Sequence, residues 1–186
     1  KLLDTTYAWM LVRNNLDKFE LDYYKPLGNP TKFIHALLSH FSRCKDEVIY
    51  PENYLEYAEN LQLDSDSAAD RADVEMEISR AKEVANSYHT YQQLLLDNNA
   101  LDFGDLINYT LKLFQQRPQI LEIFRKQFKY ILVDEFQDTN WAQYELIKIL
   151  AASKNNLMVV GDDDQAIYKF RGAAISNILS FQHDYP

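Results

Sequence analysis

The hydrophobic pattern of the chain changes after Lys129, and this change constrains the fold more than any other feature. Before that point, apolar residues recur every three or four positions, as along one face of a helix. After it come two short, continuous apolar runs, at residues 130–133 and 157–160. Such runs are typical of strands buried on both faces of a parallel sheet, and a helical pattern follows each of them. Two strands do not complete a sheet, so we predict a mainly α chain joined to part of an α/β domain.

Caps and periodicity predict the helices of the first part. Asn29 and Pro30 resemble a cap and a first-turn proline, so a helix is expected to begin there. Proline also opens the helices expected at residues 51 and 118, and residues 68–97 form the longest candidate helix. Asp102 is expected to cap a further helix with Asp105 in its first turn. The apolar face of that helix is expected to hold Phe103, Leu106, Ile107, Thr110, Leu111 and Phe114.

The composition supports a folded chain and limits its partners. Apolar residues make up 47% and charged residues 25% of the 186 residues, close to the norm for globular proteins. The net charge of −9 argues against binding nucleic acid through bulk electrostatics, although a local basic patch is compatible with it. No apolar run approaches the roughly 18 residues of a membrane span, so we expect no membrane partner.

The only cysteine, Cys44, lies in an apolar helical pattern and is expected to be a buried structural thiol. It cannot form an internal disulfide, and no Cys/His cluster has the spacing of a zinc site. A reducing, cytoplasmic setting fits this composition.

Two acids, Asp134 and Glu135, directly follow the first predicted strand. In open α/β sheets, ligands bind beyond the carboxyl ends of the strands. One acid can hold Mg²⁺, usually through water, while the other orients or deprotonates an attacking water. The alternative is a strand end without chemistry, in which residues 138–140 simply cap the next helix.

A second polar segment, GDDDQAIYKFRGA at residues 161–173, follows the second predicted strand. Gln165 can hydrogen-bond a phosphate without adding charge, and Arg171 can pair with one. Tyr168 and Phe170 can stack on the bases of a single strand. Without a wider context, such aromatics are more often core residues than base platforms, and the three acids are explained by a solvated or helix-capping turn. An EF-hand is excluded because the central glycine and closing glutamate are missing.

Both segments resemble motifs of the UvrD/Rep/PcrA helicases of superfamily 1. VDEFQDTN at residues 133–140 is similar to motif II, whose core reads D-E-x-Q-D-T, and residues 161–173 are similar to motif III. Ala166 stands where serine is usual in motif III, and Phe170 where tryptophan is commonest. LDFGDL at residues 101–106 resembles the segment upstream of motif II, and SRCKDE at residues 42–47 weakly resembles a stretch of the family's helical insertion.

The resemblance implies a helical insertion over residues 1–115 and part of the first RecA-like (P-loop NTPase) domain over residues 116–186. It also implies ATP and Mg²⁺ as cofactors, with Asp134 and Glu135 at the metal, and Glu135 activating the hydrolytic water. Gln137 and Gln165 would sense the γ-phosphate. The family moves 3′ to 5′ on single-stranded DNA and unwinds the duplex ahead. The residues that would line the single-strand path are Tyr168, Phe170 and Arg171.

The glycine-rich Walker A loop, which holds the ATP phosphates in this family, has no counterpart in the sequence. Its pattern needs two glycines five positions apart, and no two of Gly28, Gly104, Gly161 and Gly172 have that spacing. The second motor domain, with its arginine fingers, has no counterpart either. Because the chain also begins at Lys1, we expect it to be an excised part of a helicase that alone neither hydrolyses ATP nor unwinds DNA.

Two other functions are compatible with parts of the sequence. A helical module could bind DNA or a protein without chemistry. A metal-dependent nuclease could use Asp134, Glu135, Asp138 and residues 162–164, provided that these acids converge. Either way, an incomplete sheet exposes an edge, so we expect self-association or disorder around residues 129–133.

Overall fold

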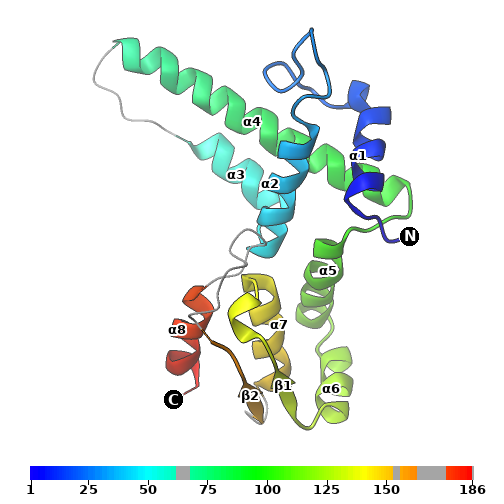
Figure 1. The fold of residues 1–186 in the computed structure, drawn as a ribbon, viewed down its shortest axis with the longest axis vertical. Helices are drawn as coiled ribbons and strands as arrows, with labels where there is room; N and C mark the ends of the chain where they lie inside the picture. Colours follow the sequence, from blue (N-terminus) through cyan, green and yellow to red (C-terminus); the bar gives the residue numbers. More distant parts are fainter. Residues whose placement is uncertain (62–67, 153–155, 163–174, 186) are drawn as a thin grey trace. The chain divides into compact units, whose positions relative to one another are not determined.

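The computed structural model describes residues 1–61, 68–152, 156–162 and 175–185 (Figure 1). The chain divides into two compact units, one formed by Lys1–Ser42 with Ile49–Phe103 and the other by Arg43–Val48 with Gly104–Pro186. The assignment of residues 1–115 to a helical insertion and of residues 116–186 to a RecA-like domain stays a prediction.

The first unit is helical. It contains α1 (Thr5–Asn14), a short 3₁₀ turn (Leu16–Lys18), most of α2 (Ile34–Asp46), α3 (Pro51–Asn60) and α4 (Ala68–Asp97). Figure 1 shows α3 beside the longer α4, and the two helices pack together. Phe41 of α2 stacks on Tyr88 and Tyr91 of α4, with ring centroids 5.0 and 5.5 Å apart. Large buried rings thus form the centre of this unit.

The predicted helix starts at Pro51 and Pro118 are confirmed, as is the long helix over residues 68–97. The predicted start at Asn29 and Pro30 is wrong, because α2 begins at Ile34. Before it, Lys32 N donates to the Asn29 carbonyl at 3.1 Å and Ile34 N to the Thr31 carbonyl at 3.2 Å. These bonds span three residues, so Pro30 lies in a turn and not in the first turn of the helix.

The second unit holds α6 (Pro118–Gln127), α7 (Trp141–Ala151), α8 (Ile175–Asp184) and, apart from its first residue, α5 (Phe103–Gln116). In α5, the predicted apolar face is partly wrong, since Phe103 is 63% and Leu106 44% exposed while Asp105 and Asn108 are buried. Asp105 forms a buried ion pair with Lys45 at 2.8 Å. Buried charges are normally paired, and this pair lies on the inward side of the helix in place of Phe103 and Leu106.

The two strands are β1 (Ile131–Val133) and β2 (Leu157–Val159), joined through α7. They pair in parallel, with Ile131 opposite Leu157 and Val133 opposite Val159, which confirms the predicted strand–helix–strand order. Their carboxyl ends therefore lie at the same edge of a two-stranded sheet.

The expectation that both strands are buried on both faces is wrong. Leu132 and Met158 are register partners, and they are 73% and 58% exposed. Side chains alternate between the faces of a strand, so these two lie on one face together, while their neighbours are half-buried. In the part of the chain that the structure describes, that face has no cover.

Cys44 is buried, and burial raises the pKa of its thiol to about 11, which agrees with a structural thiol. Among the described helices, none combines the length and the apolar character that crossing a membrane requires.

Candidate functional site

The two acids that follow β1 lie at the carboxyl end of the parallel sheet. Glu135 adopts a left-handed backbone conformation, with φ of 50° and ψ of 43°. Its backbone N–H donates to the Asp134 carboxylate at 2.9 Å, and both side chains are exposed. A left-handed conformation costs a non-glycine residue about 1–2 kcal/mol, and such strain is concentrated at functional sites. This turn presents two adjacent carboxylates to solvent at the strand end.

Gln137 connects this turn to the end of the second strand. The side chain is 2% exposed, and its Nε2 donates to Glu135 Oε2 at 2.6 Å. Its Oε1 accepts a hydrogen bond from Asp162 N at 3.1 Å. One neutral amide therefore positions the Glu135 carboxylate and fixes the chain just after β2.

Gly161 permits this close approach. A Cβ on Gly161 would lie 2.8 Å from Gln137 Oε1 and 3.3 Å from its backbone N. Phe136 N donates to the Val160 carbonyl at 2.9 Å, so the two loops are also joined through their backbones. Steric contact thus accounts for the glycine at the end of the second apolar run.

The residues after Gln137 start α7. Asn140 caps the helix by accepting from Gln143 N at 2.9 Å, and the Gln143 side chain accepts from Asn140 N at 3.0 Å. This capping box confirms the structural alternative for Asn140. Asn140 Nδ2 also donates to Asp46 Oδ1 at 2.6 Å. The helix cap at Asn140 and the exposed acids Asp134 and Glu135 therefore lie within one segment of seven residues.

Two residues of this loop's surroundings were not predicted from the sequence. Asp46 lies in the SRCKDE stretch, where only a weak family resemblance marked it. Asn177 of α8 is fully buried and donates through Nδ2 to the Thr139 carbonyl at 3.0 Å. Its one sequence signal is a polar residue placed between the apolar residues Ile175 and Ile178.

The donors in the described loop fit one kind of metal. Mg²⁺ usually takes one or two protein carboxylates and completes its shell with water and phosphate oxygens. Exposed Asp134 and Glu135 could supply such ligands. Within the described ranges, no three His, Cys, Asp or Glu side chains converge as they would in an all-protein metal cage.

The structure brings together Asp134, Glu135 and Gln137 of the predicted site. The other predicted residues belong to the segment 163–174, which lies outside the described residues; they are Gln165, Tyr168, Phe170 and Arg171.

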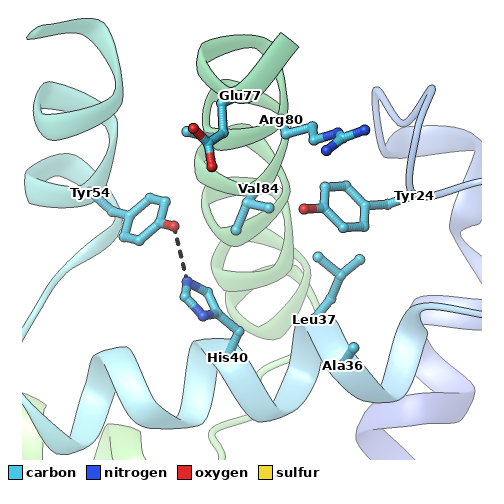
Figure 2. Close-up of a pocket in the computed structure, with 9 residues that line it drawn as sticks. Tyr24, Ala36, Leu37, His40, Tyr54, Glu77, Arg80 and Val84 are labelled. Atoms are coloured by element: carbon cyan, nitrogen blue, oxygen red, sulfur yellow. Dashed lines mark hydrogen bonds between the residues drawn. The ribbon is translucent and has the colours of Figure 1, made fainter. Parts of the chain in front are cut away.

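A separate pocket of about 450 Å³ lies in the first unit, between α2, α3, α4 and the segment around Tyr24 (Figure 2). His40 Nε2 and the Tyr54 hydroxyl are hydrogen-bonded across it at 3.0 Å. The pocket contains none of the predicted site residues. Its lining consists of Tyr24, Ala36, Leu37, His40, Tyr54, Glu77, Arg80, Ala81 and Val84.

The chain is similar to several known proteins named ATP-dependent DNA helicase PcrA. ATP-dependent DNA helicase PcrA of Bacillus subtilis (strain 168) is 42% identical over 186 residues, which is 100% of this chain and 22% of that protein. PcrA of Staphylococcus aureus (strain Mu50) is 48% identical over 136 residues, 73% of this chain and 18% of that protein. PcrA of Staphylococcus epidermidis is 57% identical over 103 residues, 55% of this chain and 14% of that protein.

The chain therefore spans about a fifth of the length of the first two relatives. A sequence model of one family, described as the UvrD/REP helicase N-terminal domain, matches residues 4–186. The match covers nearly the whole chain and includes the acids after β1 as well as the helical first part. The chain belongs to the UvrD/REP helicase N-terminal domain family.

Proposed function

We propose that this chain provides part of the ATP site of an ATP-dependent DNA helicase. The observation that carries the proposal is the Gln137 amide, which joins the Glu135 carboxylate to Asp162 N at the carboxyl ends of two parallel strands. Ligands of α/β sheets bind at this edge. The relatives of the chain that are named ATP-dependent DNA helicase PcrA support the same function.

The three site residues that the structure describes, Asp134, Glu135 and Gln137, each have a role in this proposal. Asp134, exposed at the strand end, would hold Mg²⁺, which neutralises phosphate charge when it is bound. Glu135 would contribute to the metal site and accept a proton from the attacking water. The short hydrogen bond from Gln137 Nε2 would keep the Glu135 carboxylate in one orientation. Gln137 would also respond to the γ-phosphate, since its amide touches both loops.

The remaining roles depend on the family resemblance. Gln165 would be a second γ-phosphate sensor, and the single-strand path would be lined by Tyr168, Phe170 and Arg171. The full-length protein would move 3′ to 5′ on single-stranded DNA and unwind duplex DNA, in the cytoplasm. Residues 1–115 would be the helical insertion and residues 116–186 part of the RecA-like domain. The 186-residue chain alone would hydrolyse no ATP, because its glycines cannot form a Walker A loop.

The proposal is tested by the substitution Glu135→Gln in the full-length protein. Removing the base should lower DNA-stimulated ATP hydrolysis by roughly 10²- to 10⁴-fold, while binding of a fluorescent ATP analogue persists. Glu122→Gln is the matched control, because Glu122 is an exposed residue of α6 that pairs with Arg125 of the same helix. Its hydrolysis rate should equal that of the wild type.

Two outcomes contradict the proposal. Full activity of the Glu135→Gln protein would remove Glu135 from the chemistry. DNA cleavage with Mg²⁺ or Mn²⁺ in the absence of ATP would favour the nuclease alternative. The direction of movement is measured separately, by strand displacement on duplexes with a 3′ or a 5′ single-stranded tail. Unwinding from the 5′ tail alone would contradict the 3′-to-5′ assignment.

A further inference from the structure

Asn177 is a buried polar residue that contacts the backbone of the loop carrying the acids. Its side chain is 0% exposed, and Nδ2 donates to the Thr139 carbonyl at 3.0 Å and more weakly to Thr139 Oγ1 at 3.4 Å. The contact joins two segments far apart in the sequence, the start of α8 and the residue before the α7 cap. None of the roles proposed above involves it.

Packing alone does not account for an asparagine at this position. Its Oδ1 is buried and has no hydrogen-bond partner among the described residues. Burying an unsatisfied acceptor is unfavourable, and an apolar side chain of similar size would avoid that cost. Other contacts also hold α8 in the second unit. The Tyr144 hydroxyl donates to Asp184 Oδ2 at 2.7 Å, and the rings of Phe136 and Phe181 meet edge to face at 5.5 Å.

Thr139 is the residue through which Asn177 can act on the acids. Thr139 Oγ1 donates to the Phe136 carbonyl at 2.7 Å, and Thr139 N donates to the same carbonyl at 3.1 Å. These bonds close the 3₁₀ turn Phe136–Asp138, whose middle residue is Gln137. Asn177 therefore fixes the end of the turn that aims the Gln137 amide at Glu135.

We propose that Asn177 is a positioning residue for ATP hydrolysis, holding Thr139 so that the Gln137–Glu135 pair keeps its geometry. This inference rests on the proposed function. Misplacing a catalytic group by about 1 Å can lower turnover about 10²-fold. Loss of the Asn177 donor should therefore reduce turnover more than it reduces nucleotide binding.

The test compares Asn177→Leu with Tyr144→Phe in the full-length protein. Asn177→Leu removes the donor that bonds Thr139 at two atoms, and Tyr144→Phe removes the bond to Asp184. Of these contacts, those of Asn177 reach the acid-bearing loop. With saturating single-stranded DNA, Asn177→Leu should lower kcat roughly tenfold to a hundredfold, and kcat/KM for ATP should fall with it. Tyr144→Phe should retain the wild-type kcat. Rates are normalised to the folded fraction, measured by circular dichroism and thermal melting.

Wild-type kcat in Asn177→Leu, or equal losses of kcat in both variants, would show that Asn177 only supports the fold. Asn177→Asp, which is nearly isosteric, covers the case in which the leucine variant does not fold. A protonated carboxyl can still donate to the Thr139 carbonyl, whereas an ionised one cannot. The ratio of its kcat to that of the wild type should therefore fall over the pH range in which the introduced carboxyl ionises, as followed by NMR. A constant ratio across that ionisation would overturn the inference. A wild-type protein without DNA-stimulated hydrolysis would instead refute the proposed function itself.

Discussion

Single residues hold the loop after β1 through neutral amides and not through charges. Gln137 and Asn177 each contact the backbone of a neighbouring segment, and Gln137 also contacts a carboxylate. An amide offers a donor and an acceptor together, so one side chain can satisfy an acid and an N–H. A carboxylate at position 137 would repel Glu135. The amides leave Asp134 and Glu135 as the charged groups that the turn presents to a ligand.

The Gly161→Ala substitution tests how tightly this arrangement is packed. The new Cβ would lie 2.8 Å from Gln137 Oε1, and that buried amide is bonded at both ends, so it cannot swing aside freely. We expect a loss of about 1–2 kcal/mol in the free energy of unfolding, measured by urea denaturation of the chain. Gly28→Ala is the control, because a Cβ added at Gly28 would meet nothing within 4 Å. Equal stability of the two variants would contradict the packing described around Gln137.

The sequence predicts some of these residues and not others, for a physical reason. Asp134, Glu135 and Gln137 are close in the chain, and strand polarity alone places them at the carboxyl edge. Asp46 contacts the same loop at Asn140, which is 94 positions away in the sequence. Asn177 contacts it at Thr139, which is 38 positions away. No local pattern specifies contacts over such distances, because they depend on how the helices pack.

At the level of elements, periodicity predicts where most helices lie but not always which face is buried. In α5, the apolar pattern favours Phe103 and Leu106 as inward residues, yet Asp105 takes an inward position and pairs with Lys45. Leaving one partner of such a pair buried and unpaired costs about 3–5 kcal/mol, so Asp105 and Lys45 must be buried together. Apolar periodicity alone does not predict such a pair.

The start of α7 gives an element-scale prediction, because Asn140 both caps the helix and bonds Asp46. Asn140→Ala loses both contacts and should cost about 2–4 kcal/mol in the free energy of unfolding. Asn140→Ser keeps an oxygen that can accept from Gln143 N but loses the donor to Asp46, so it should cost about half as much. Urea denaturation of the chain measures both values.

A double-mutant cycle separates the cap from the Asp46 contact. In an Asp46→Ala background, Asn140→Ser should have almost no further effect, because the bond it would remove is already absent. Additive costs would mean that Asn140 and Asp46 do not stabilise each other, contrary to their 2.6 Å hydrogen bond.

On the scale of the whole molecule, the two-stranded sheet has one apolar face that no described residue covers. Continuous apolar runs are typical of strands covered on both faces, yet Leu132 and Met158 lie exposed side by side. The apolar runs therefore predict burial of a sheet face that is exposed among the described residues. The chain covers 22% of its Bacillus subtilis relative.

This exposed face carries the prediction for the isolated chain. Unpaired strand edges and bare apolar surface favour association with another copy, so the sedimentation coefficient should rise with protein concentration. Leu132→Lys places a charge in the middle of β1 and should suppress that rise, because charged side chains on short strands block edge pairing. Leu27→Lys adds the same charge at a fully exposed residue outside the helices and strands, and it should leave the association unchanged. If both lysines weaken association equally, net charge and not the sheet governs association. A wild-type chain that sediments as a monomer at every concentration would show that the exposed sheet does not cause association.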